Sequence, residues 1–80
     1  ELSTVTLAFP EHLTGVMLDR FGKEVILRKD TTGYSIRTDI VISDHFFGWL
    51  AGLGKSVKIV SPDDIRQQYK QYLSDILKEI

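Results

Sequence analysis

The chain has 80 residues, of which 42% are hydrophobic and 26% charged, and this composition is typical of one small globular domain. Ten Lys and Arg against eleven Asp and Glu give a net charge of -1, which excludes a whole-molecule attraction to nucleic acid or anionic lipid. The absence of cysteine excludes disulfides, thiolate nucleophiles and cysteine zinc sites, and it fits a reducing compartment.

The hydropathy pattern and the first residue bear on where the chain works. No apolar run approaches the roughly 18 residues of a membrane-spanning helix, so we expect no membrane partner and a cytoplasmic location. The chain opens with Glu1 rather than methionine and leads almost directly into a strand. We therefore expect residues 1–80 to form a single domain excised from a longer protein.

The first two elements follow from a change of apolar period. Apolar residues first alternate with polar or small ones, as in a half-buried strand, at Val5, Leu7 and Phe9. Pro10 and Glu11 suit the first turn of a helix. The apolar stripe of this helix comprises Leu13, Val16, Met17 and Phe21. Gly22 then predicts the end of the helix.

A hairpin follows. Residues 23–29 are rich in β-formers and predict a strand, and residues 30–33, Asp-Thr-Thr-Gly, predict its loop. The next strand runs from Tyr34 to Ile42, where apolar residues alternate with polar ones. Ser43 and Asp44 are both suitable caps for a second helix.

The stretch from Phe46 to Ile65 predicts helix, stop, strand and helix in turn. The helical face is formed at spacing i, i+3, i+4 and i+7 by Phe46, Trp49, Leu50 and Leu53. Gly54 predicts the stop, and the alternation around Val57 and Ile59 predicts a short strand. Ser61 is expected to cap the last helix, with Pro62 in its first turn.

The last helix is predicted to be about 18 residues long, or roughly 27 Å. Its apolar stripe comprises Ile65, Tyr69, Tyr72, Leu73, Ile76, Leu77 and Ile80. This is more apolar surface than a small core requires, and two interpretations stay open. The stripe either docks on the sheet edge or open face of the same chain, or packs against another domain or protomer.

The order β-α-β-β-α-β with an added C-terminal helix predicts an α+β, ferredoxin-like fold. Right-handed crossovers place both internal helices on one face of a four-stranded antiparallel sheet. The other face of the sheet is then open.

Few residues offer catalytic or metal-binding chemistry. His12 and His45 stand without a second ligand at metal spacing. Gly54-Lys55-Ser56 resembles the end of a phosphate loop, but Trp49 occupies the position of its first glycine. We therefore expect no enzyme activity, no catalytic residue, no metal site and no cofactor.

The open face of the predicted sheet carries the one candidate ligand site. Arg37 and Lys58 share that face with hydroxyl side chains, and Arg28 lies nearby. Such a surface suits phosphate or nucleic-acid backbone. The alternative is an ordinary solvated face whose charge is balanced by Asp39.

Taken together, these elements resemble the C-terminal extension (WCX) domain that follows the WYL domain in bacterial transcriptional regulators. The matching pattern is Val5-x-Leu7-x-Phe9, Phe21-Gly22 and Trp49-Leu50-x-x-Leu53-Gly54-x-x-Val57-x-Ile59-x-x-Pro62-x-x-Ile65-Arg66, followed by the amphipathic tail. The resemblance covers essentially the whole chain. Leu53-Gly54 replaces the usual Phe-Gly, and Ile80 replaces a closing aromatic.

The resemblance implies a non-catalytic module that assists dimerisation and effector response in a helix-turn-helix regulator. Its partners would be the helix-turn-helix and WYL domains of the same parent chain, in a homodimer whose DNA is bound elsewhere than on these residues. The expected effector is a nucleotide or a single-stranded nucleic acid. The expected interface residues are Phe47, Tyr69, Tyr72, Ile76 and Ile80. The alternative is a free-standing ferredoxin-like module that binds a small anion or nucleic-acid backbone.

Overall fold

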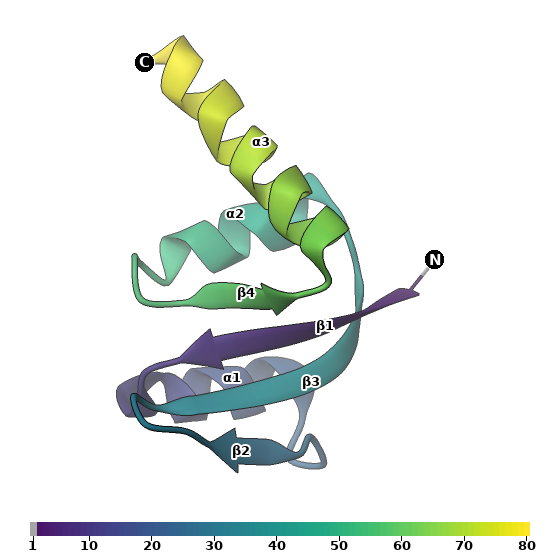
Figure 1. The fold of residues 1–80 in the computed structure, drawn as a ribbon, viewed down its shortest axis with the longest axis vertical. Helices are drawn as coiled ribbons and strands as arrows, with labels where there is room; N and C mark the ends of the chain where they lie inside the picture. Colours follow the sequence, from purple (N-terminus) through teal and green to yellow (C-terminus); the bar gives the residue numbers. More distant parts are fainter. Residues whose placement is uncertain (1) are drawn as a thin grey trace.

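The strands and helices follow one another in the order that the apolar periods predict. In the computed structural model, which describes residues 2–80, the elements are β1 (Leu2–Phe9), a 3-10 helix (Glu11–Leu13), α1 (Thr14–Phe21), β2 (Leu27–Lys29), β3 (Tyr34–Val41), α2 (Asp44–Gly52), β4 (Lys58–Ser61) and α3 (Asp63–Glu79). The strands form one antiparallel sheet in the order β2-β3-β1-β4. Helices α1 and α2 cover the same face of this sheet, and α3 projects away from it (Figure 1). The ferredoxin-like prediction is confirmed.

The core lies between the sheet and the helices α1 and α2. Alternation along β1 turns Val5, Leu7 and Phe9 inward, and these side chains are buried. The other buried hydrophobic residues are Met17, Ile36, Ile40, Phe46, Phe47, Leu50, Val57, Ile59 and Ile65. One layer of side chains thus joins β1, β3 and β4 to the helices, and Leu27 of the short β2 packs against it in part.

The predicted helix ends and hairpin loop are confirmed. Gly22 and Gly54 adopt φ values of 92° and 100°, which favour glycine, just after α1 and α2. In the loop between β2 and β3, the Asp30 carboxylate accepts hydrogen bonds from the backbone N–H of Thr32 (2.9 Å) and Gly33 (2.8 Å). These contacts fix the register of the hairpin.

Three details differ from the sequence predictions. The strand predicted over residues 23–29 is paired only from Leu27 onward, because the chain returning from α1 buries Val25 in part before it reaches the sheet. Val16 is 38% exposed, because it lies about 100° around α1 from the buried Met17, at the edge of the apolar stripe. Ser61 does not cap α3: it remains in β4, paired with Thr6, and Pro62 is the N-cap residue without a side-chain hydrogen bond.

None of the helices within residues 2–80 combines the length and the apolar character needed to cross a membrane.

One hydrogen bond identifies which of the two candidate residues caps α2. The Ser43 hydroxyl oxygen accepts a hydrogen bond from the backbone N–H of Phe46 at 3.1 Å, so Ser43 is the N-cap and Asp44 lies in the first turn. This cap sets where α2 begins, and with it the position of Phe46 and Phe47 in the core.

We expect Ser43→Ala to lower the free energy of unfolding by about 1 kcal/mol, because a first-turn N–H loses its acceptor. Urea titration followed by circular dichroism measures this change. Ser56→Ala, in the exposed turn before β4, is the matched control and should change stability by less than about 0.5 kcal/mol. Equal effects of the two substitutions would contradict the assigned cap.

Candidate functional site

An aromatic cluster holds α3 against α2. The Phe47 ring lies 5.4 Å from the ring of Tyr69 and 5.6 Å from the ring of Tyr72, centroid to centroid, and both pairs are tilted. Phe47 is 4% exposed. These distances are in the range of favourable aromatic pairs, so this cluster fixes the direction of α3.

A glycine on α2 makes room for this contact. A Cβ atom at Gly48 would lie 3.2 Å from the hydroxyl oxygen of Tyr72, which is closer than most such contacts allow. The absence of a side chain at Gly48 therefore lets Tyr72 seat on α2. Three residues of the predicted interface, Phe47, Tyr69 and Tyr72, thus make contacts within the chain, and their role toward another protomer stays a prediction.

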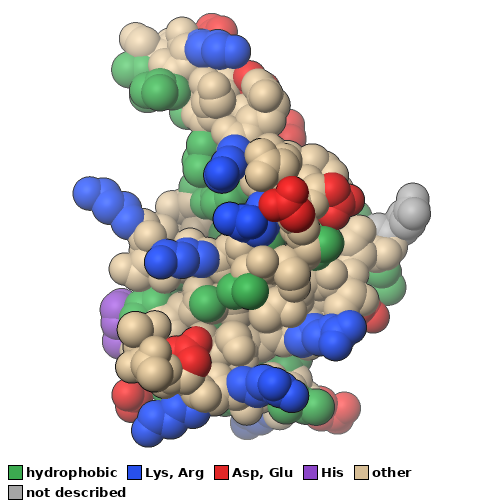
Figure 2. All heavy atoms as spheres, viewed as in Figure 1, with side chains coloured by type: hydrophobic (Ala, Val, Ile, Leu, Met, Phe, Trp, Pro, Cys, Tyr) green, Lys and Arg blue, Asp and Glu red, His purple; other side chains and the backbone are tan. Residues whose placement is uncertain are grey.

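The outer end of α3 extends past α2 and lacks such cover. Leu73 is 39% exposed, Ile76 44%, Leu77 70% and Ile80 95%. Hydrophobic side chains line one side of this projecting end (Figure 2). The apolar stripe is therefore divided: its inner half docks within the chain, and its outer half is exposed.

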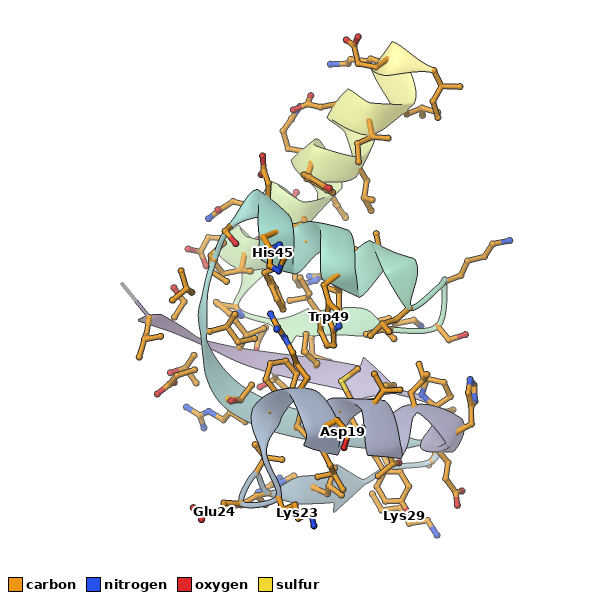
Figure 3. All side chains as sticks on the ribbon, turned by 180° about the vertical axis from the view of Figure 1, so that it is seen from behind. Asp19, Lys23, Glu24, Lys29, His45 and Trp49 are labelled. Carbon is orange, nitrogen blue, oxygen red and sulfur yellow. The ribbon has the colours of Figure 1, made fainter. Side chains whose placement is uncertain are left out.

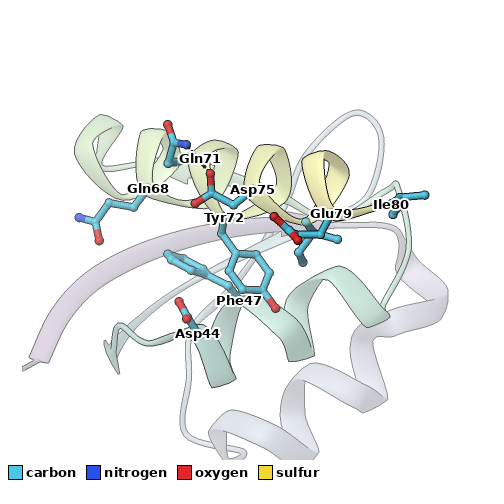
Figure 4. Close-up of a pocket in the computed structure, with 9 residues that line it drawn as sticks. Asp44, Phe47, Gln68, Gln71, Tyr72, Asp75, Glu79 and Ile80 are labelled. Atoms are coloured by element: carbon cyan, nitrogen blue, oxygen red, sulfur yellow. Dashed lines mark hydrogen bonds between the residues drawn. The ribbon is translucent and has the colours of Figure 1, made fainter.

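Two grooves of opposite charge flank α3. The first, between α2 and α3, has a volume of about 660 Å³ and includes the carboxylates of Asp44, Asp75 and Glu79 among its lining. Phe47 and Tyr72 lie against each other in its floor (Figure 4). No lysine or arginine among the described residues lines it.

The second groove lies between β4 and α3 and has a volume of about 540 Å³. We call it the β4–α3 groove. Its lining residues are Val57, Lys58, Ile59, Val60, Arg66, Tyr69, Lys70 and Leu73. Within residues 2–80 it is lined by cations and apolar groups without a carboxylate.

The sheet face opposite α1 and α2 carries the predicted basic residues, and Figure 2 shows Lys and Arg side chains spread across it. One row of paired residues crosses all strands: Arg28, Ser35, Ala8 and Lys58. Because neighbouring strands are about 4.8 Å apart, the two ends of this row are separated by about 14 Å. The structure therefore places Arg28 and Lys58 on one face without bringing them together.

Arg28 and Arg37 do share a hollow. Its volume is about 810 Å³, and its lining includes the carboxylates of Glu24 and Asp39 and the hydroxyl side chains of Thr4, Thr6 and Ser35, but not Lys58. The Thr4 hydroxyl donates a hydrogen bond to the Asp39 carboxylate at 2.5 Å. This hydrogen bond holds Asp39, the acid expected to balance the face, against β1.

The helix layer contains a contact that the apolar pattern did not predict. The Arg20 guanidinium lies 5.0 Å from the centre of the Trp49 ring, and Phe21 meets the same ring edge-on at 5.6 Å. Trp49 points from α2 toward α1 (Figure 3). Aromatic spacing predicted Trp49 as a core residue, but a cation above its ring depends on how α1 and α2 pack.

Residues 2–80 contain no cluster of three His, Asp or Glu side chains that could hold a metal ion. His12 and His45 are exposed on different elements.

Comparison with known proteins gives one match. A protein-family model described as the WCX domain matches residues 1–77. The searches of curated proteins and of solved structures found no match.

Tyr69 in the aromatic cluster makes the stability of the fold depend on pH. Burial, and secondarily the neighbouring Tyr72, raise the pKa of Tyr69 above its ordinary value of 10.0. The unfolded chain therefore releases this proton at lower pH than the folded chain, so stability is lost as the pH rises past 10.0. We expect the fall in melting temperature between about pH 9 and about pH 11 to be smaller in Tyr69→Phe than in the wild type. Parallel falls would contradict the partial burial of the Tyr69 side chain.

Proposed function

The chain belongs to the WCX domain family, and on this basis we propose that it is a non-catalytic regulatory module of a helix-turn-helix transcriptional regulator. In the bacterial regulators that this sequence resembles, this module follows a WYL domain. Its proposed role is to assist dimerisation and the response to an effector, while the parent protein binds DNA through another domain. We place this regulator in the bacterial cytoplasm.

One observation supports this proposal: the inner half of α3 is packed within the chain, whereas its outer half is exposed. The inner half is anchored on Phe47, whereas the outer half exposes an apolar stripe that ends at Ile80. A rigidly held helix with an exposed apolar end is suited to joining protomers. If two arrangements of the protomers bind the effector with different affinity, effector binding would shift the population between them. This shift would couple effector binding to the release or capture of DNA.

We expect Ile76→Gln and Ile80→Gln, introduced together in the regulator, to weaken dimerisation by about tenfold or more, because burial of two large apolar side chains is lost. Light scattering across a concentration series measures the dissociation constant. Ile26→Gln, at a side chain that is 74% exposed on another surface, is the matched control. If removal of residues 1–80 leaves both assembly and effector response intact, the proposal fails.

A second candidate function rests on the hollow that contains Arg28 and Arg37. We propose that this site binds the phosphate of a nucleotide or of a single-stranded nucleic acid, which would make it the effector site. The two guanidinium groups supply charge, and Thr6 and Ser35 supply hydroxyl groups on the same lining. Lys58 lies on β4, outside the hollow, so it would contact a bound nucleic acid only if that nucleic acid extended beyond the hollow.

We expect Arg37→Ala to weaken binding of a nucleoside monophosphate and of a short single-stranded DNA by about tenfold at low salt, because a charge-assisted contact is lost. Fluorescence titration measures both affinities. Lys78→Ala removes one cation from the last turn of α3, far from the hollow, and should leave binding unchanged. Equal affinities for wild type and Arg37→Ala would argue for an ordinary solvated face.

A further inference from the structure

Strand β4 forms one edge of the sheet and pairs with β1 on one side only. Within residues 2–80, no backbone hydrogen bond beyond those of the strands and helices involves Lys58–Ser61. In an edge strand, alternate N–H and C=O groups point away from the sheet and can pair with a further strand. The outer edge of β4 can therefore accept an extended chain.

The β4–α3 groove runs along this edge. The four residues of β4 span about 13 Å, and the stretch of α3 from Arg66 to Leu73 spans about 10 Å. Helix α3 starts at the end of β4 and diverges from it (Figure 1). At about 3.3 Å per residue, this length takes about four residues of extended chain.

The cations of this groove are not neutralised by the chain itself. Arg66 pairs with Asp63 at 3.0 Å, the one ion pair formed within residues 2–80, which leaves Lys58 and Lys70 without an acidic partner. No carboxylate of the described residues lines the groove. Figure 2 shows Lys and Arg side chains on α3 and β4 beside hydrophobic ones. The groove therefore complements a chain that carries carboxylates.

The charged and the apolar parts of the lining lie on different sides. Ile59 is buried in the core, so alternation along β4 turns Lys58 toward the open face of the sheet. Tyr69 contacts Phe47 of α2, on the helix side. An extended chain in the groove would meet charge on one face and apolar surface on the other. A strand in which acidic and apolar residues alternate has these two faces.

From these features we propose that the β4–α3 groove binds an extended acidic segment of a partner protein, which adds to the sheet as a further strand beside β4. Nucleic acid fits less well, because a sugar–phosphate chain offers few donors for the outward carbonyl groups of β4. A second copy of β4 would bring its own Lys58 to a basic groove, and like charges repel. The inference goes beyond the proposed function, since it depends neither on dimerisation nor on the hollow that contains Arg28 and Arg37.

A fluorescein-labelled octapeptide of alternating glutamate and valine tests this site, with fluorescence polarisation as the measurement. We expect the groove variant, Lys58→Glu with Lys70→Glu, to raise its dissociation constant by about tenfold to 100-fold, because two charge-assisted contacts become repulsive. Lys23→Glu with Lys29→Glu is the matched control and should leave the affinity unchanged, since these lysines lie at the opposite edge of the sheet, near β2 (Figure 3). An octapeptide of alternating lysine and valine should bind the groove variant and not the wild type, which also establishes that the variant folds.

Modification of the peptide backbone tests the strand pairing. The glutamate–valine octapeptide with every backbone amide N-methylated keeps its side chains but cannot donate to β4, and we expect it to bind about tenfold or more weakly. Absence of binding to the wild type, equal binding to the groove variant, or equal binding of the N-methylated peptide would each overturn the inference. A thymidine oligonucleotide whose binding is lost in Lys70→Glu would overturn it too, and would assign the groove to nucleic acid.

Discussion

The contact of Phe47 with Tyr69 and Tyr72 is the constraint on which the surface of this domain depends. Residue 62 alone separates β4 from α3, so one end of the helix is fixed by the sheet. The aromatic cluster fixes a second point about two helical turns further on. With two points held, the rest of α3 has one path, which leads past the end of α2 and away from the core (Figure 1).

The position of α3 also separates charges that cancel in the composition. The net charge of -1 conceals an acidic groove on the α2 side of the helix and a basic groove on the β4 side. A separate hollow over β2 and β3 holds Arg28 and Arg37 together with the carboxylates of Glu24 and Asp39. The groove that we propose for an acidic partner segment and the hollow that we propose for an anionic effector therefore lie on different strands of the sheet.

The sequence predicted most elements of the fold correctly because each of these elements depends on residues that are close together along the chain. Alternation in β1, the glycines after α1 and α2, and the Asp30 turn each depend on a few neighbouring residues. Tertiary pairing decided what could not be predicted: the short β2, the retention of Ser61 in β4, and the separation of Lys58 from the two arginines. Tyr72 and Ile76 belong to the same stripe, and only the length of α2 determines that the first is covered and the second is 44% exposed.

Hydrogen exchange along α3, followed by mass spectrometry at rising protein concentration, tests the division of this helix most directly. The account predicts that amides in residues 66–72, the first of which donates to the Pro62 carbonyl, are protected at every concentration, because the aromatic cluster holds this half of the helix within one chain. Amides in residues 73–79 should exchange fast when the protein is dilute and become protected as it assembles. Protection that is uniform along α3 and independent of concentration would contradict it.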